Sequence, residues 1–256
     1  MKEKGRNRQS GRSADKHAAR PDGPVWLWGI HAVEAAINNP ARKALKLVAT
    51  KNAAQRLGTS TAEIMEGKAL SALLPKGAVH QGLAMRTEPL KPVTLADVIG
   101  ASPARVAVLD QVEDPHNLGA IFRSAAAFGV SALILQTRHA PLVTGIVAKS
   151  AAGAIERVSE CRVVNIARSL DALADAGYVS VGLAGEGRQT LAEMVANEPR
   201  LALVLGAEGA GLRPAVAKAC TCIARIPIQA EMESLNVSNA AAIAFYEASR
   251  GVFSPD

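Results

Sequence analysis

The chain of 256 residues is poor in cysteine and in aromatic residues, and it contains no long apolar run. Its three cysteines, Cys161, Cys220 and Cys222, are too few and odd in number for a disulfide framework, and they indicate reduced intracellular thiols. With aromatic residues at only 3%, a wall of rings that stack on nucleic-acid bases is not expected. No stretch approaches the roughly eighteen apolar residues of a transmembrane helix, so we expect a cytoplasmic protein that stays out of the membrane.

Motifs of several well-known chemistries are absent or incomplete. Cys220 and Cys222 lack the second pair of ligands that a structural zinc site needs, which favours buried strand cysteines. The segment 182–189 has the glycine spacing of a phosphate-binding loop, but Arg188 and Gln189 replace the lysine and the metal-binding hydroxyl. We therefore interpret it as a glycine-rich surface loop. No metal hydrolase or serine hydrolase motif is present, and no metal is expected.

The positive charge is concentrated at the N-terminus. Residues 1–22 contain seven Lys or Arg and three acidic residues, while the whole chain has a net charge of +6. Because this segment has almost no large apolar residues, we expect a disordered basic tail. Two interpretations stay open, a solubilising extension and an arm that attracts RNA phosphates. The acidic residues and the lack of an apolar face argue against a mitochondrial transit peptide.

The pattern of helices and strands predicts two folded units joined by a linker. Residues 24–88 read as a small α/β domain, a Pro-rich polar stretch opens a linker over 89–104, and 105–252 form a larger α/β domain. In the larger domain, short apolar strands alternate with helices, which indicates a mostly parallel sheet covered on both faces. The expected helices are 30–37, 60–73, 117–128, 142–149, 165–176, 190–197, 212–219 and 240–248, and the expected strands are 45–49, 82–85, 106–109, 132–135, 179–181 and 201–205.

Ligands bind such sheets at the loops that leave the carboxyl ends of the strands, and the first of these loops precedes helix 117–128. Asp114 and Asn117 are both good helix caps, and Pro115 suits the turn between them. Arg123 is not explained in this way, because a cation two turns into a largely apolar helix needs a partner or a function. His116 is more often a loop histidine than a general base.

Two further segments carry unusual residues. Gly206-Ala207-Glu208-Gly209-Ala210-Gly211 follows strand 201–205, and its glycines permit a close backbone approach or a positive φ, while the Glu208 carboxylate could face a pocket. At the start of the last helix, one polar residue is enough for a cap. We expect the surplus there, Ser234 and Asn236, to face whatever the glycine loop holds.

Taken together, these segments resemble the three motifs of the SpoU family within the SPOUT class of methyltransferases. A fourth segment, 149–154, is similar to the S-x-G-A turn of that family, and 29–33 and 80–82 are similar to its small domain with a ribosomal-protein-L30-like fold. The resemblance spans residues 24–252. The three motifs are Asn117…Arg123, then Gly206-Ala207-Glu208-Gly209-x-Gly211, and then Ile226-Pro227…Ser234-Leu235-Asn236-Val237-Ser238.

The resemblance implies a fold, a cofactor and a reaction. The C-terminal end would be threaded into a trefoil knot, an exception to the rule that chains avoid knots. S-adenosylmethionine would lie in that knot and donate a methyl group to a ribose 2′-hydroxyl of RNA, in an enzyme that acts as a homodimer. Backbone groups and apolar walls of the second and third motifs would hold the cofactor. These positions are Leu205, Gly206, Gly211, Ile226, Ile228 and Leu235.

The resemblance also assigns catalytic roles. Arg123 would bind an RNA phosphate and orient or help to deprotonate the hydroxyl, and the phosphate role is favoured because a guanidinium is nearly always charged. Asn117, Glu208, Ser234 and Asn236 would hold the ribose, Arg123 and one another by hydrogen bonds. The enzyme would align two reactants and help to remove one proton.

The third motif departs from the common Ile-Pro-Met-x-Gly of the family, because Ile228 and Ala230 replace the methionine and the glycine. The L30-like unit favours a guanosine of 23S rRNA as the target, since the tRNA branch of the family generally lacks it. The alternatives are a tRNA or antibiotic-resistance rRNA 2′-O-methyltransferase, and a non-catalytic RNA-binding or ribosome-assembly protein. The presence of every catalytic residue argues against the non-catalytic alternative.

Overall fold

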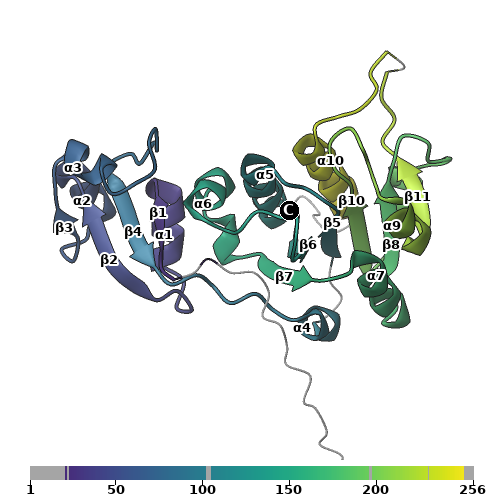
Figure 1. Ribbon diagram of the computed structural model, residues 1–256, viewed down its shortest axis with the longest axis horizontal. Coiled ribbons are helices and arrows are strands. Elements are labelled where there is room, and N and C mark those ends of the chain that lie inside the picture. The colour runs from purple at the N-terminus through teal and green to yellow at the C-terminus, as the bar shows by residue number, and fades with distance from the viewer. Residues whose placement is uncertain (1–20, 22, 102–104, 196–197, 230, 251–256) are drawn as a thin grey trace, which may run out of the picture.

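The computed structural model describes most of the chain as two α/β parts that lie side by side (Figure 1). The predicted basic tail lies outside the described residues, apart from Pro21. Ala230, the departure in the third motif, lies outside them as well. The described residues are 21, 23–101, 105–195, 198–229 and 231–250.

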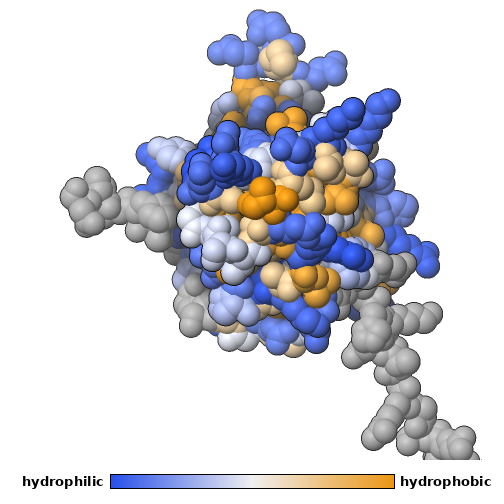
Figure 2. Space-filling view, turned by 90° about the vertical axis from the view of Figure 1, so that its left-hand side faces the viewer, coloured by the Kyte–Doolittle hydropathy of each residue, from blue (hydrophilic) through white to orange (hydrophobic). Residues whose placement is uncertain are grey.

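The N-terminal part is a four-stranded sheet with helices packed on it. The strand order is β1-β4-β2-β3, with β4 antiparallel to both of its neighbours and β3 parallel to β2. Seen end-on in Figure 2, this part has a mainly hydrophilic surface with scattered apolar side chains. Its elements are β1 (Val25–Trp28), α1 (Ile30–Ile37), β2 (Ala44–Ala49), α2 (Lys51–Leu57), β3 (Glu63–Ile64), α3 (Gly67–Ser71) and β4 (Leu83–Thr87).

The predicted helix over 60–73 is wrong. Within this range, the two residues of β3 pair with the edge of β2 and extend the sheet, and only α3 is helical. The structure instead has an unpredicted helix, α2, just before this segment. Its signals are local, because the Thr50 hydroxyl caps the N-terminus and Gly58 ends the helix with φ +64°.

The C-terminal part confirms the predicted, mostly parallel sheet. All pairings between its seven strands are parallel, in the order β7-β6-β5-β10-β8-β11-β9. Its elements are α4 (Leu95–Gly100), β5 (Arg105–Leu109), α5 (Pro115–Ala127), β6 (Val130–Gln136), α6 (Gly145–Ala151), a 3₁₀ turn (Ala154–Glu156), β7 (Ser159–Val163), α7 (Ile166–Asp175), β8 (Val179–Leu183), β9 (Gln189–Thr190), α8 (Leu191–Val195), β10 (Leu201–Leu205), α9 (Pro214–Ala219), β11 (Cys222–Arg225) and α10 (Val237–Ser249).

Alternation along the strands gives this sheet two apolar layers. Leu109 of β5 faces the layer of α5 and α10, whereas Val108 faces the layer of α7 and α9. The segment expected as a linker contains α4, which a Thr94–Asp97 capping box starts. In the described residues, no helix is long and apolar enough to span a bilayer, and no group of three or more His, Cys, Asp or Glu could hold a metal ion.

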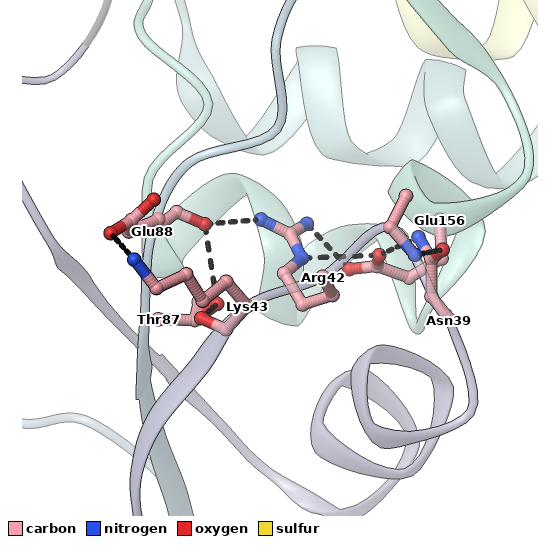
Figure 3. A network of polar contacts seen from close by, with 7 residues as sticks. Asn39, Arg42, Lys43, Thr87, Glu88 and Glu156 are labelled. Carbon is pink, nitrogen blue, oxygen red and sulfur yellow. Dashed lines mark hydrogen bonds and ion pairs between the residues drawn. The ribbon is translucent and has the colours of Figure 1, made fainter.

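A buried ion pair joins the two parts (Figure 3). The Arg42 guanidinium donates to both Glu156 carboxylate oxygens, at 2.6 and 3.2 Å, and both side chains are only 3% exposed. Asn39 donates to the same carboxylate at 2.7 Å, so the buried charges are paired and hydrogen-bonded. Nearby, Gly145 at the start of α6 lies against Trp28 so closely that a Cβ would be 2.0 Å from the ring. The two parts are therefore in close contact at Gly145.

Candidate functional site

The three predicted motifs meet at the carboxyl ends of three strands. The loop after β5 leads into α5, which Asp114 caps by accepting from the His116 amide at 2.9 Å. The glycine loop follows β10, and the third motif connects β11 to α10. Parallel strands place their carboxyl ends at one edge of a sheet, which brings these distant segments together.

A polar network links one residue from each motif. The Glu208 Oε1 atom accepts from the Asn117 side chain at 3.1 Å and from the Asn236 side chain. The Val237 amide also donates to this oxygen, at 3.4 Å. The Asn236 amide group additionally donates to Asn117 Oδ1 at 3.1 Å. Three of the five predicted catalytic residues are therefore in direct contact.

Asn236 fills both roles that were expected of different residues. Its Oδ1 caps α10 by accepting from the amides of Ser238 and Asn239, at 2.9 and 3.4 Å, while its amide group joins the network. The prediction that another polar residue caps α10, and that Asn236 is not needed for the cap, is therefore wrong. A side-chain amide permits this because its oxygen accepts and its nitrogen donates. Ser234 is exposed and lines the neighbouring cavity.

The glycines of the second motif are required by the shape of their loop. A Cβ on Gly206 would lie 2.1 Å from the carbonyl carbon of Gly211, so no other residue fits there. Gly209 and Gly211 have φ values of +76° and +66°, which favour glycine. The Ala207 and Gly211 backbones exchange hydrogen bonds at 3.1 and 3.0 Å and close a tight turn.

A cavity of about 370 Å³ lies between the glycine loop, the third motif and the end of β8. Its walls combine apolar side chains with the glycine backbone, and Glu208 and Ser234 also line it. A cavity lined by both apolar and polar groups suits a nucleoside-sized cofactor such as S-adenosylmethionine, which has an apolar base and polar ribose and amino-acid groups. All six positions predicted to hold the cofactor line this cavity, namely Leu205, Gly206, Gly211, Ile226, Ile228 and Leu235.

Sequence reasoning missed one wall of this cavity. Residues 183–186, read above as part of a surface loop, line it beside the glycine loop. Gly187 is explained by packing, because a Cβ there would lie 2.6 Å from the Ala224 backbone. The useful signal was the position of the segment at the end of a strand, not its similarity to a phosphate-binding loop.

A second cavity, of about 290 Å³, lies on the other side of the polar network. Asn117 and Glu208 line it, together with the loop after β5. Glu208 borders both cavities, so its carboxylate stands between the candidate cofactor cavity and a neighbouring space that could admit a substrate group.

Two residues that the sequence did not single out hold the glycine loop in place. Asp110, at the end of β5, is fully buried, and its carboxylate accepts from the Arg213 amide at 3.0 Å and from Arg213 Nε at 2.8 Å. The Asp110 amide donates to Leu205 O at 2.8 Å. Since Leu205 and Arg213 flank the glycine loop, Asp110 fixes both of its ends.

Arg123 does not join the network within this chain. It lies on α5 with its side chain exposed, and it lines neither cavity. Within the described part of the chain, it makes no hydrogen bond or ion pair with Asn117, Glu208 or Asn236. The expected contacts between Arg123 and these residues are therefore absent from a single chain. His116 is exposed, and its Nδ1 lies 3.3 Å from Ser150 Oγ.

The chain is similar to known proteins over nearly its whole length. The profile of the "SpoU rRNA Methylase family" matches residues 104–246. The "23S rRNA (guanosine-2'-O-)-methyltransferase RlmB" of Coxiella burnetii is 35% identical over 237 residues, covering 88% of this chain and 94% of that protein. The protein of the same name from Xylella fastidiosa (strain Temecula1) is 39% identical over 245 residues, covering 88% and 96%. The crystal structure of the SpoU methyltransferase AviRb from Streptomyces viridochromogenes in complex with AdoMet superposes with a TM-score of 0.75 and 26% identity, covering 90% of each chain.

Proposed function

Because the chain belongs to the SpoU rRNA methylase family, we propose that it transfers the methyl group of S-adenosylmethionine to a ribose 2′-hydroxyl of RNA, at a guanosine of 23S rRNA. The observation that carries this proposal is the convergence of Asn117, Glu208 and Asn236 beside the glycine-loop cavity. The similarity of the RlmB proteins extends through the N-terminal part, which supports rRNA over tRNA as the substrate.

Two neighbouring cavities would hold the two reactants, the cofactor in one and a substrate group in the other. The cofactor supplies an activated methyl group, and the glycine loop and the third motif would hold it in the larger cavity. Glu208 Oε1 is held by three N–H donors, from Asn117, Asn236 and Val237, which fixes the carboxylate in one position. Its other oxygen can then accept a hydrogen bond from the ribose. Holding the hydroxyl in line with the methyl donor supplies much of the rate enhancement in such a reaction.

We place the phosphate-binding role on Arg123, supplied by a second copy of the chain. The side chain is an exposed cation that no carboxylate among the described residues neutralises, so an RNA phosphate can pair with it. The homodimer would form through α5 and α10, where Ile243 and Tyr246 are 41% and 54% exposed. The trefoil knot, the L30-like fold of the N-terminal part, the domain limits 24–88 and 105–252, and action in the cytoplasm belong to the same proposal.

The test combines a methyl-transfer assay with a cofactor-binding measurement. Purified protein, radiolabelled S-adenosylmethionine and a 23S rRNA transcript should give one labelled guanosine, and the phosphodiester on the 3′ side of this nucleotide should resist alkaline cleavage because its 2′-oxygen is methylated. Arg123→Ala should lower turnover by about 10²-fold or more, as removal of a positioned group does, while calorimetry shows cofactor affinity within a few-fold of wild type. Absence of cofactor binding by the wild-type protein would instead support the non-catalytic RNA-binding alternative.

A further inference from the structure

Lys149 occupies an unusual place at the seam between the two parts. It lies on α6 of the C-terminal part, and its Nζ donates to Gln81 Oε1 of the N-terminal part at 2.6 Å. Among the described residues this neutral amide oxygen is its one hydrogen-bonding partner, and no carboxylate pairs with it. The ammonium is thus held in position without a counter-charge.

Two buried arginines of the chain, in contrast, are each paired with a carboxylate. Arg42 pairs with Glu156 at 2.6 Å and Arg162 pairs with Glu160 at 2.5 Å. Withdrawing a cation from water is costly unless an anion compensates for it. Lys149 is partly exposed, and the partial loss of water lowers the pKa of its ammonium, yet no carboxylate of the described residues pairs with it. An anion supplied by a ligand would compensate for this partial desolvation.

The local backbone is shaped to receive the Lys149 side chain. Gly29 has φ +85°, which favours glycine, and Lys149 Nζ lies 2.4 Å from where a Cβ on this residue would stand, so the ammonium packs closely against the Gly29 backbone. Gln81 has φ +54°, an uncommon conformation for a residue other than glycine. Its Oε1 also accepts from the Ile30 amide, at 3.3 Å. Residues of the N-terminal part therefore hold in position a charge that the C-terminal part supplies.

The residue next to Lys149 connects its position to the candidate active site. Ser150, the residue after Lys149, lies with its Oγ 3.3 Å from His116 Nδ1. Ser150 also packs against α5, because a Cβ on Gly119 would lie 2.4 Å from its own Cβ. His116 directly precedes Asn117 of the polar network. An extended RNA strand that contacts the N-terminal part and enters the site would pass along this line.

We propose that Lys149 is a binding site for a phosphodiester of the substrate RNA, which crosses the seam between the N-terminal part and the active site. An ammonium has three N–H donors, and Gln81 uses one of them, so two remain for phosphate oxygens. This inference rests on the proposed function, since it takes RNA as the substrate. The interaction positions the strand and takes no part in the chemistry at the ribose.

The test is RNA binding across a salt series. Lys149→Met keeps the apolar stem and removes the charge, and Lys218→Met, at an exposed lysine of α9, serves as the matched control. With a 23S rRNA transcript, Lys149→Met should bind about tenfold more weakly, as for loss of one charge-assisted contact. Its slope of log affinity against log salt should fall by roughly 0.7 to 0.9. Lys149→Arg should restore the slope, and Lys218→Met should match wild type.

A second variant separates phosphate binding from a purely structural contact. Gln81→Ala leaves the charge on Lys149, so its salt slope should stay at the wild-type value. If Lys149 served only to clamp the two parts together, Lys149→Met and Gln81→Ala would have equal effects and neither slope would change, which would overturn the proposal. Cofactor affinity should be unchanged in every variant. Failure of the proposed function is recognised separately, because the wild-type protein would then transfer no methyl group to the transcript.

Discussion

Asp110→Asn is the most informative single substitution in the glycine-loop region. The Asp110 side chain is 0% exposed, and it holds Arg213, whose side chain is 38% exposed, through contacts of 2.6 to 3.0 Å. Asparagine keeps the shape but removes the charge, and one of its two terminal atoms becomes a donor that faces the donors of Arg213. Asp110 would then no longer hold the C-terminal end of the loop that contains Gly206 and Glu208.

The size of the effect follows from burial. Removing one partner of a buried ion pair costs about 3 to 5 kcal/mol, because the other charge is left uncompensated. Since water can reach Arg213, the lower end applies, about 3 kcal/mol. At roughly 2 to 4 °C per kcal/mol for a chain of this size, the midpoint of thermal unfolding should fall by about 6 to 12 °C. If about 1.4 kcal/mol of this loss acts on the conformation of the loop, cofactor affinity falls about tenfold.

The measurements are calorimetric, with Glu156→Gln as the matched control. That substitution neutralises a carboxylate of another buried pair, whose side chains are both 3% exposed, and neither partner lines the cofactor cavity. We expect a similar or larger loss of thermal stability in Glu156→Gln, with cofactor affinity within about twofold of wild type. The reasoning is refuted if Asp110→Asn binds S-adenosylmethionine as wild type does, or if both variants lose affinity equally.

Three further predictions concern other parts of the chain. Gly206→Ala should abolish cofactor binding in calorimetry, because its Cβ would lie 2.1 Å from Gly211. Burial raises the pKa of Cys161 from 9.0 to about 12. Stability should therefore fall as the pH rises from about 9 toward 12, where unfolded thiols ionise first, and urea titrations should show a shallower fall for Cys161→Ala. Removing residues 1–22 should lower the salt slope of RNA binding by about 2 to 3 if three or four basic residues engage phosphates, and leave cofactor affinity unchanged.

The parts of the fold that could be predicted from sequence are those with strong local patterns. Strand 201–205 is continuously apolar, and the structure has β10 over the same residues. Strand β7 was missed, because its sequence, Ser-Glu-Cys-Arg-Val, places charged side chains in a strand that is largely buried. The charge of Arg162 is accommodated by Glu160 and by the carbonyls of Ala140 and Pro141. No local pattern reveals such partners from a distant loop.

The residues of the candidate site also fall into two groups, those that stand out in the sequence and those whose contacts only the fold reveals. Glu208 and Asn236 could be singled out because each has more polarity than its turn or cap requires. Asp110 could not, and Lys149 stood out only as part of segment 149–154, because the significance of both lies in contacts with Arg213 and Gln81, which are 103 and 68 residues away along the chain. Residues of this kind look like ordinary charged positions until the fold supplies their partners.

The position of Arg123 shows how helix geometry limits what one motif can do in one chain. Asn117 and Arg123 are six residues apart on α5, so they differ by about 120° around the helix axis and by roughly 9 Å along it. Asn117 is turned inward and meets Glu208 and Asn236, and Arg123 therefore has to point elsewhere. A motif that contains both residues serves two surfaces at once. One surface completes the network of its own chain, and the other carries the exposed Arg123, for which we propose the phosphate-binding role.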